Sequence, residues 1–469
     1  MNEWQTLTLA DVCTVITDGA HQSPKTVSRG KPMASVKDLT RFGVDLTSAR
    51  HIATEDFEAL VKQGCKPHVG DVLIAKDGNS ALDTVCTVDH PLDAVLLSSV
   101  AILRPDPKCL DSVFLKFYLS SPETIDYLKS NFISGAAIPR VVLRDFKRAE
   151  IRLPSLDVQR RIAGVLQSID SKIDLNRRVN QTLEAMAQAI FQSWFVEFDP
   201  VKAKIAAKQE GRDPLRAAMT AVSGKADAEL DALPPEQYEQ LAATAALFPG
   251  EMEASELGEI PKGWSHKALL QLTDKIGSGS TPRGGKEVYL EEGVALIRSQ
   301  NVYDSLFAWD GLARISDEAA AQLKGVTVQE EDVLLNITGA SILRTCVVEP
   351  DVLPARVNQH VAIIRAKAGV PPRFIHMHLL RPDIKNYLLG LNAGASREAI
   401  TKAHIESLVL LTPGPELLSA FQTAISPLFR QVHCLTRQMR ALGELRDTLL
   451  PKLLSGELLV ADAIAEAVA

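Results

Sequence analysis

The segment GDVLIAKDG at residues 70–78 has a close counterpart in EDVLLNITG at residues 331–339. The same offset, about 260 residues, relates VAILR (100–104) to VAIIR (361–365). It also relates FLKFYLSSPETIDYL (114–128) to FIHMHLLRPDIKNYL (374–388). Because these pairs follow one another in the same order, they indicate one large structural unit that occurs twice in the chain.

Each copy begins with a mixture of strand-like and helix-like segments. Short apolar runs bounded by Gly, Asp or Pro, such as DVLIA at 71–75, predict strands. SVFLKFYLSS (112–121) and RFIHMHLLR (373–381) have apolar residues at spacings of three and four, which predicts helices. We therefore expect an α+β domain over 1–155 and a second one over 262–415.

Apolar residues then recur with a period of 3.5 residues, and this pattern is typical of a coiled-coil seam. We expect long helices over 156–195 and 416–458, with Pro154 and Pro413 just ahead of them. Pro427 allows a kink or a late start in the second helix. The candidate seam and subunit-docking residues are Ile162, Leu166, Ile169, Ile173, Leu183 and Ile190, with Ile425, Leu428, Val432, Leu435, Leu442 and Leu449.

Two asparagines, Asn176 and Asn180, interrupt the first seam. Polar seam residues often set register and partner, although a solvent-facing accident is the alternative. A helix over 157–194 is about 57 Å long and needs a partner along its whole seam. The equivalent helix of the other copy is the simplest partner. The expected fold is thus α+β, with two repeated domains separated by two long antiparallel coiled-coil helices.

Charge is distributed unevenly along the chain, whose formal net charge is −7. Residues 199–260 hold 12 acidic and 6 basic side chains, whereas residues 134–178 hold 10 basic and 5 acidic ones. The total therefore hides a local basic stretch, and the local field is what a phosphate backbone meets. We expect 196–261 to be an acidic linker with short helices and 459–469 to be a C-terminal tail.

Composition favours a soluble globular protein, with 46% hydrophobic residues. The six cysteines lie far apart and form no CxxC pair, which fits reduced thiols in the cytoplasm. No apolar run approaches the roughly 18 residues of a membrane helix, and the first residues lack the basic and apolar regions expected of a signal peptide. We expect a cytoplasmic protein that has no membrane association.

One glycine-rich loop, KIGSGSTPRGGK at 275–286, looks at first like a phosphate-binding loop. A P-loop needs a glycine at position 280 and Ser or Thr after Lys286, but Ser280 and Glu287 stand there. The matching segment of the first copy, ITDGAHQSPK at 16–25, does not share the glycine pattern. We therefore expect a variable surface loop and no nucleotide site.

The layout and several segments resemble the specificity subunit of type I restriction–modification systems. These segments are IRLPSLDVQRRIAGVLQSIDSKIDLNRR (151–178), SELGEIPKGW (255–264) and LRDTLLPKLLSGEL (445–458), together with the paired GDVLIAKDG and EDVLLNITG. The second helix departs from the family pattern, with PELLSAFQTAI where the first copy has LDVQRRIAGVL.

The resemblance implies that each α+β domain recognises one half of a bipartite site in double-stranded DNA. It implies that the helices dock two modification subunits, which bind S-adenosylmethionine and methylate adenine N6. A restriction subunit that hydrolyses ATP can join them. No cofactor is implied for this chain itself.

Readout of DNA needs polar and basic side chains on loops that reach base edges. Each candidate could equally be a solvated surface residue. The candidates are Lys25, Arg29, Lys76 and Arg140 in the first domain, and Arg283, Arg298, Gln300, Asn301, Asn336, Thr338, Arg344 and Arg397 in the second.

Catalytic motifs are missing from the sequence. LPPEQY (233–238) lacks the acid or amide that opens an adenine methyltransferase motif, and no GxGxxG follows a strand. His376 and His378 align with Lys116 and Tyr118, which argues against a repeated metal site. We expect a non-catalytic subunit. Two alternatives stay open, namely an enzyme whose active site escapes motif reading and a two-domain DNA-binding regulator without enzymatic partners.

Overall fold

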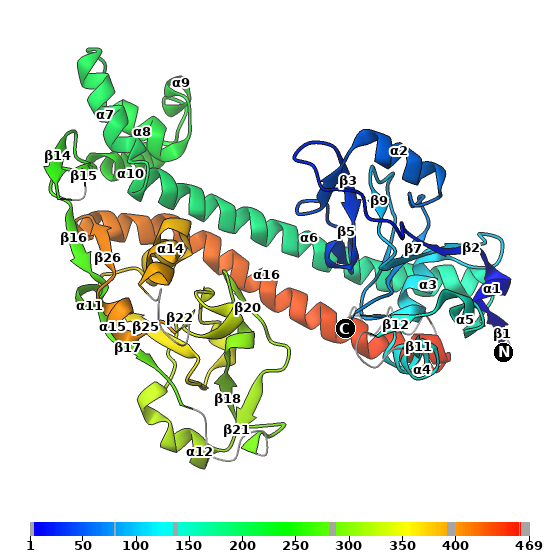
Figure 1. Cartoon of the computed structure of the whole chain (residues 1–469). Helices are drawn as coiled ribbons and strands as arrows, with labels where there is room; N and C mark the ends of the chain where they lie inside the picture. Colours follow the sequence, from blue (N-terminus) through cyan, green and yellow to red (C-terminus); the bar gives the residue numbers. More distant parts are fainter. Residues whose placement is uncertain are drawn as a thin grey trace. The chain divides into compact units, whose positions relative to one another are not determined.

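The computed structural model describes residues 4–78, 81–134, 139–256, 258–280, 288–391, 399–458 and 460 (Figure 1). The chain divides into two compact units. The first unit comprises Met1–Val179 and Cys434–Ala469, and the second comprises Asn180–His433. Each unit contains one domain of mixed strands and helices, called here the first and the second sheet domain, and a part of each of two long helices.

The first sheet domain is built on a four-stranded antiparallel sheet in the order β2-β10-β7-β8 and a three-stranded sheet in the order β6-β3-β9. A pair of strands, β1 and β13, joins its two ends. Its strands are β1 (Gln5–Thr8), β2 (Cys13–Asp18), β3 (Lys31–Ala34), β4 (Leu39–Thr40), β5 (Gly43–Val44), β6 (Arg50–Ile52), β7 (Val72–Ala75), β8 (Val85–Thr87), β9 (Val95–Leu96), β10 (Val100–Pro105), β11 (Ile133–Ser134), β12 (Arg140–Val141) and β13 (Glu150–Leu153). Its helices are α1 (Leu9–Val12), α2 (Thr54–Lys62), α3 (Ser112–Leu119), α4 (Pro122–Phe132) and α5 (Leu143–Phe146).

The second sheet domain repeats this plan, with sheets in the orders β17-β25-β22-β23 and β21-β18-β24 and a joining pair β16–β26. Its strands are β16 (Ser265–Ala268), β17 (Thr273–Ser278), β18 (Val294–Ile297), β19 (Val302–Tyr303), β20 (Leu306–Phe307), β21 (Ala313–Ile315), β22 (Val333–Asn336), β23 (Thr345–Val347), β24 (Ala355–Val357), β25 (Val361–Ala366) and β26 (Val409–Thr412). Its helices are α11 (Leu269–Leu272), α12 (Asp317–Gln322), α13 (Pro372–Leu380), α14 (Pro382–Gly390) and α15 (Lys402–Glu406).

The strand orders confirm the predicted internal repeat, and one ion pair confirms it at the level of side chains. Arg104 Nε donates to the fully buried Asp71 at 2.7 Å in the first domain. Arg365 Nε donates to the buried Asp332 at 2.7 Å in the second. These residues belong to the segments matched in the sequence, so the repeat extends from backbone to an internal charge pair.

Two long helices complete the fold: α6 (Leu156–Phe195) and α16 (Pro415–Ser455). Both predicted long helices are therefore confirmed. Helix α16 begins at Pro415, so the late start allowed for Pro427 is wrong, and Pro427 lies exposed within the helix. Proline removes one backbone donor, and an exposed position lets water replace it at the carbonyl it leaves free.

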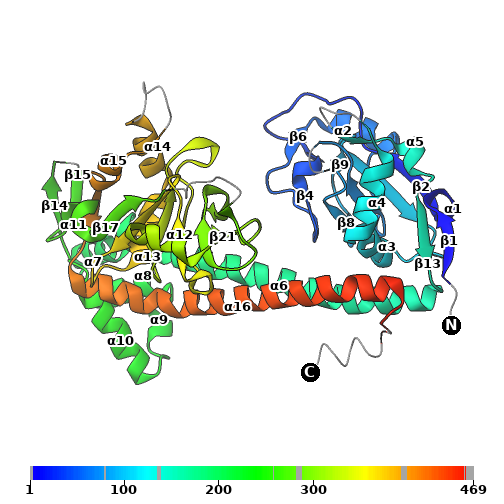
Figure 2. The same ribbon diagram turned by 90° about the horizontal axis from the view of Figure 1, so that it is seen from below.

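Within each unit, the parts of α6 and α16 lie side by side (Figures 1 and 2). In the first unit Arg446 Nη1 donates to Asp170 at 3.1 Å, and Asn176 Nδ2 donates to Gln438 at 2.8 Å. Higher numbers on α6 thus meet lower numbers on α16, as in an antiparallel pair.

The predicted seam is the buried side of these helices. Seven of its members are buried, namely Ile162, Leu166, Ile169, Ile425, Val432, Leu435 and Leu449. The others are half-buried, namely Ile173, Leu183, Ile190, Leu428 and Leu442. The 3.5-residue period therefore identified the contact face of both helices.

The acidic segment after α6 folds into short helices followed by a hairpin. The helices are α7 (Asp199–Gln209), α8 (Pro214–Ser223), α9 (Asp227–Leu230) and α10 (Pro235–Ala246), and the hairpin strands are β14 (Met252–Ser255) and β15 (Gly258–Pro261). A small core of Ala218, Met219, Leu230 and Ala245 holds the helices together. In the described part of the chain, no helix is long and apolar enough to cross a membrane.

Candidate nucleic-acid interface

A polar pocket of about 390 Å³ lies on the second sheet domain, between the turn after β18 and the connection from β22 to β23. Three predicted candidates, Gln300, Thr338 and Arg344, line this pocket together. They come from segments up to 44 residues apart in the chain, and the two sheets bring them to one place. Tyr303 and His360 complete the wall.

The pocket wall carries planar and hydrogen-bonding groups. The Arg344 guanidinium lies over the ring of Tyr303, 4.5 Å from its centroid. Thr338 Oγ1 and His360 Nδ1 are 2.6 Å apart, and Gln300 Nε2 donates to the Gly311 carbonyl at 3.2 Å. Among the described lining residues none is acidic. This combination suits a ligand with hydrogen-bonding edges and flat faces.

Two further candidates, Asn301 and Asn336, are fully buried behind the pocket. Asn301 Oδ1 accepts from the backbone amide of Arg298 at 3.0 Å, and its Nδ2 donates to the Ala308 carbonyl at 2.9 Å. Asn336 Nδ2 donates to the carbonyls of Ser299 at 2.9 Å and Val302 at 3.2 Å. These amides hold the turn that carries Gln300, so in this structure they position the pocket wall and do not reach its opening.

The second domain has three more arginine candidates, namely Arg283, Arg298 and Arg397. Arg298 is half-buried, stacks on Tyr289 at 5.2 Å and donates to the Gly311 carbonyl at 2.5 Å. Arg283 and Arg397 lie outside the described residues.

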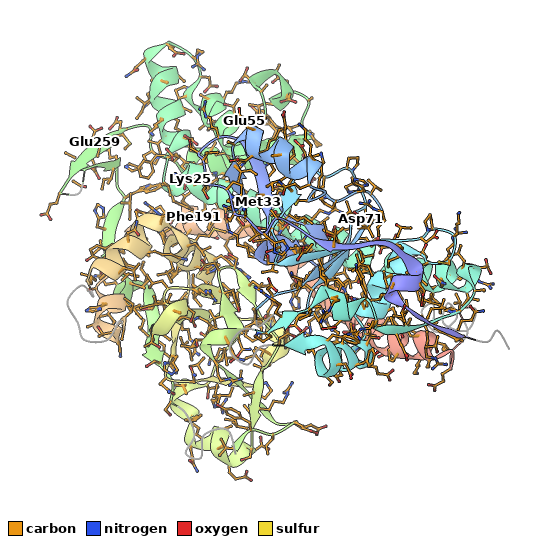
Figure 3. All side chains as sticks on the ribbon, turned by 45° about the vertical axis from the view of Figure 1, so that its right-hand side comes forward. Lys25, Met33, Glu55, Asp71, Phe191 and Glu259 are labelled. Carbon is orange, nitrogen blue, oxygen red and sulfur yellow. The ribbon has the colours of Figure 1, made fainter. Side chains whose placement is uncertain are left out.

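The four candidates of the first domain are more scattered. Lys25 and Arg29 are exposed on the segment between β2 and β3, and Lys25 is labelled in Figure 3. Arg140 is largely exposed and its Nε donates to Asp77 at 3.0 Å. Lys76 is buried, and its Nζ donates to Asp18 at 2.5 Å, so its charge is neutralised inside the domain. Lys25, Arg29 and Arg140 are therefore accessible to a ligand, and Lys76 is shielded.

Sequence reasoning missed Tyr303 and His360. Tyr303 is an exposed aromatic residue in SQNVY (299–303), where polar residues precede a large ring. Aromatic residues interleaved with polar and basic ones are a known feature of surfaces that bind nucleic acids, so this segment contained a usable signal. His360 precedes a buried strand and carried no signal of its own.

The histidine pair and the glycine-rich loop have structural explanations. Burial lowers the pKa of His376 and of His378 to about 3, so both are neutral. His376 Nε2 lies 3.1 Å from the Thr345 carbonyl, and His378 packs edge-on against Phe374. Within the described residues, no group of three or more His, Cys, Asp or Glu side chains could hold a metal ion.

The glycine-rich loop shares more with the first copy than its sequence suggested. A Cβ on Gly279 would lie 1.7 Å from the Val357 carbonyl oxygen, and one on Gly19 would lie 2.1 Å from that of Leu96. Both glycines therefore allow the same close approach of two backbone segments. Lys286 and the two glycines before it are outside the described residues.

On α6 of the first unit, two apolar residues face away from the seam. Leu175 is 50% exposed and Val179 is 36% exposed, and they are one helical turn apart. An exposed apolar pair on a long helix is a candidate contact for another protein.

The chain is similar in sequence to a family of known proteins. The model of the type I restriction modification DNA specificity domain matches residues 1–185. The specificity subunit of the type I restriction enzyme HindI from Haemophilus influenzae is 30% identical over 390 residues, which cover 79% of this chain and 83% of the relative. The MjaIX specificity subunit from Methanocaldococcus jannaschii is 24% identical over 347 residues, covering 73% and 68%.

A solved structure has the same fold at low sequence identity. The crystal structure of the S subunit of a type I restriction–modification system from M. genitalium aligns with 96% of each chain at a TM-score of 0.50 and 15% identity. The chain therefore belongs to the family of type I restriction–modification specificity subunits.

Proposed function

We propose that each sheet domain recognises one half of a bipartite site in double-stranded DNA. The observation that carries this proposal is the pocket of the second domain, where Gln300, Thr338 and Arg344 meet beside an exposed tyrosine. In the major groove, arginine can bind the edge of guanine and glutamine the edge of adenine, each through two hydrogen bonds. A repeated fold that presents different side chains in its two copies fits a site with two different halves.

The long helices are proposed to dock two modification subunits that methylate adenine N6. Support comes from family membership and from the exposed pair Leu175 and Val179 on α6. S-adenosylmethionine would be bound by the modification subunits, and ATP by a restriction subunit that joins them. The chain itself would then supply recognition and no catalytic group. Restriction–modification complexes act on genomic DNA, so the cytoplasm is the proposed compartment.

Domain replacement tests the proposal directly. Residues 262–415 are exchanged for the equivalent domain of a relative, and the chain is expressed with its modification subunit in a host that lacks adenine methylation. Methylation-aware sequencing of the host genome then gives the recognised motif. We expect one half of the motif to change and the other half to stay. A folded hybrid whose motif changes in both halves, or in neither, would contradict the proposal.

A further inference from the structure

The guanidinium of Arg344 is held in place without using its hydrogen-bond donors. It lies over the Tyr303 ring at 4.5 Å, and its N–H groups have no partner among the described residues. Other arginines of the same domain are bonded, such as Arg314 to the Gly293 carbonyl at 3.0 Å and Arg356 to the Ala320 carbonyl at 3.1 Å. Stacking on an aromatic ring fixes the plane of a guanidinium and leaves its edge available.

The surroundings of Arg344 narrow the kind of ligand that its edge would meet. The pocket has no acidic lining residue among those described, so a group rich in acceptors is not repelled. Gln300 and the Thr338–His360 pair offer further donors and acceptors among the residues that line the pocket. A phosphate needs donors alone, whereas a base edge next to other base edges needs both kinds of group.

We propose that Arg344 reads a guanine in the half-site of the second domain, with two N–H groups donating to O6 and N7. This inference rests on the proposed function and assigns one residue to one base. Tyr303 would act as a positioning residue, because its ring sets the plane of the guanidinium. Asn336, which donates to the carbonyls of Ser299 and Val302, would position the segment that carries Gln300 and Tyr303.

The first domain has different side chains at the matched places. The strand pairings place Asp77, Thr84 and Ser99 where the second domain has Thr338, Arg344 and His360. None of these three side chains carries the pair of N–H groups that donates to guanine O6 and N7 together. The guanine contact is therefore specific to the second domain, and a variant at Arg344 should leave the other half-site unchanged.

The test uses the full chain together with its modification subunit. Arg344→Ala, Arg344→Lys and Tyr303→Ala are compared with Arg314→Ala, an arginine of the same domain outside the pocket. Thermal unfolding first confirms that each chain folds. Motifs are read by methylation-aware sequencing, and methylation rates are measured on oligonucleotides with each base at each position of the half-site.

For Arg344→Ala, discrimination for guanine at one position should fall about 10- to 100-fold, with the other half-site intact. Tyr303→Ala should reduce the discrimination for guanine at the same position by a smaller factor. Arg314→Ala should change neither the motif nor the methylation rate. A uniform fall in rate with an unchanged motif would mean a phosphate contact and would overturn the assignment. An unchanged motif and rate would overturn it too. If domain replacement changes one half-site while Arg344 variants do not, only the assignment fails and the proposed function stands.

Discussion

The two units differ in the side chains that join their parts of α6 and α16 to the sheet domain. In the first unit a single carboxylate, Asp170, is 1% exposed and accepts from three cations. Lys116 Nζ lies at 2.8 Å, Arg446 Nη1 at 3.1 Å and Arg41 Nε at 3.2 Å from its oxygens. Lys116 lies on α3 and Arg41 on the β4–β5 turn, both in the sheet domain, and Arg446 lies on α16.

The second unit uses a cluster of aromatic rings at this junction. Phe195 on α6 packs against Phe421 on α16 at 4.9 Å and against Phe374 of the sheet domain at 5.1 Å. Trp194 packs against Phe248 at 5.2 Å. The residue matched to Lys116 is His376, which is buried and neutral.

This difference shows that the two copies share a backbone fold, whereas the side chains that join the sheet domain to the helices differ between them. Packing between aromatic rings does not depend on pH. Its contribution to stability decreases only when side-chain volume is removed. A carboxylate that holds three cations depends on pH and on each member of the set. The two units should therefore respond differently to the same disturbance, and the following variants would break or sharpen that contrast.

The largest effect is expected from Phe421→Ala, which removes a fully buried ring from the aromatic cluster. The second unit should lose about 4 kcal/mol of unfolding free energy, since the loss of this ring leaves a cavity among the packed rings of α6. Hydrogen exchange resolved by peptide should show faster exchange in 180–433 than in the first unit, at pH 5 and at pH 8 alike. Phe421→Leu serves as the control and should lose less than half as much. Equal loosening of both units would contradict a separate junction.

Asp170→Asn comes next, because it removes the counter-charge of the buried Lys116, whereas Arg446 keeps its ion pair with Asp447. We expect the first unit to lose about 3 kcal/mol. Burial alone would raise the pKa of Asp170, but the charges of Lys116, Arg41 and Arg446 outweigh it and hold that pKa below its ordinary value of 3.8. The wild-type contribution is therefore present above pH 3.8 and is lost as the pH falls through the lowered pKa.

Chemical unfolding of the Asp170→Asn chain between pH 3 and pH 7 tests this account. The gap between wild type and variant should shrink at the acid end. A gap that stays constant over this range would show that the carboxylate is not ionised in the folded chain.

An opposite pH dependence is expected from Glu184 in the second unit. Burial raises the pKa of Glu184 from 4.5 to about 7, and the nearby Glu349 adds to the effect while Arg373 opposes it. A carboxyl group with a raised folded pKa favours the folded state below pH 4.5, and this advantage is lost as the pH rises toward 7. Glu184→Gln should thus raise the unfolding free energy at pH 8 by about 2 kcal/mol, after allowance for partial exposure.

The matched control for Glu184 is Glu416→Gln, at an exposed carboxyl of α16 in the same unit. It should change the unfolding free energy by less than about 0.5 kcal/mol, as surface substitutions usually do. If Glu184→Gln gives the same small change at pH 5 and pH 8, Glu184 is already ionised without cost and the contrast between the units is weaker.

The smallest effects concern the polar seam in the first unit. Asn176 is 1% exposed, and its Nδ2 donates to Gln438. Asn176→Leu should raise the unfolding free energy by about 1 kcal/mol, since an apolar residue packs better in a seam. Gln438→Leu should lower it by about 1 kcal/mol, because a buried amide loses its acceptor. Urea unfolding of both variants measures the two signs. The same sign for both would mean that this hydrogen bond does not matter for the seam.

The sequence predicted the periodic features of this fold well and its polar interior poorly. The seam from Ile162 to Leu449 was visible because apolar side chains at a 3.5-residue spacing have few other uses. Asn301, Asn336 and Lys76 are candidates for DNA contact in the sequence but are buried in the fold. Burial of a polar side chain depends on partners brought by the tertiary fold, so the sequence does not predict it. The stacking of Arg344 on Tyr303 was not predictable either, since Tyr303 belongs to β19 and Arg344 to the connection before β23, and the two meet only after the sheets form.

The division of the helices between the units has a consequence for synthesis on the ribosome. The second unit is one continuous stretch, Asn180–His433, whereas the first unit needs Cys434 and the residues beyond it. The face of Ile162, Leu166 and Ile169 is covered by Leu449, Leu450 and Leu453, which are made last. At a synthesis rate of about 5–20 residues per second, this apolar face stays exposed for on the order of 15–60 s before the residues that cover it are made. The second unit can complete its fold first, and the nascent first unit is the part of the chain that a chaperone would have to protect.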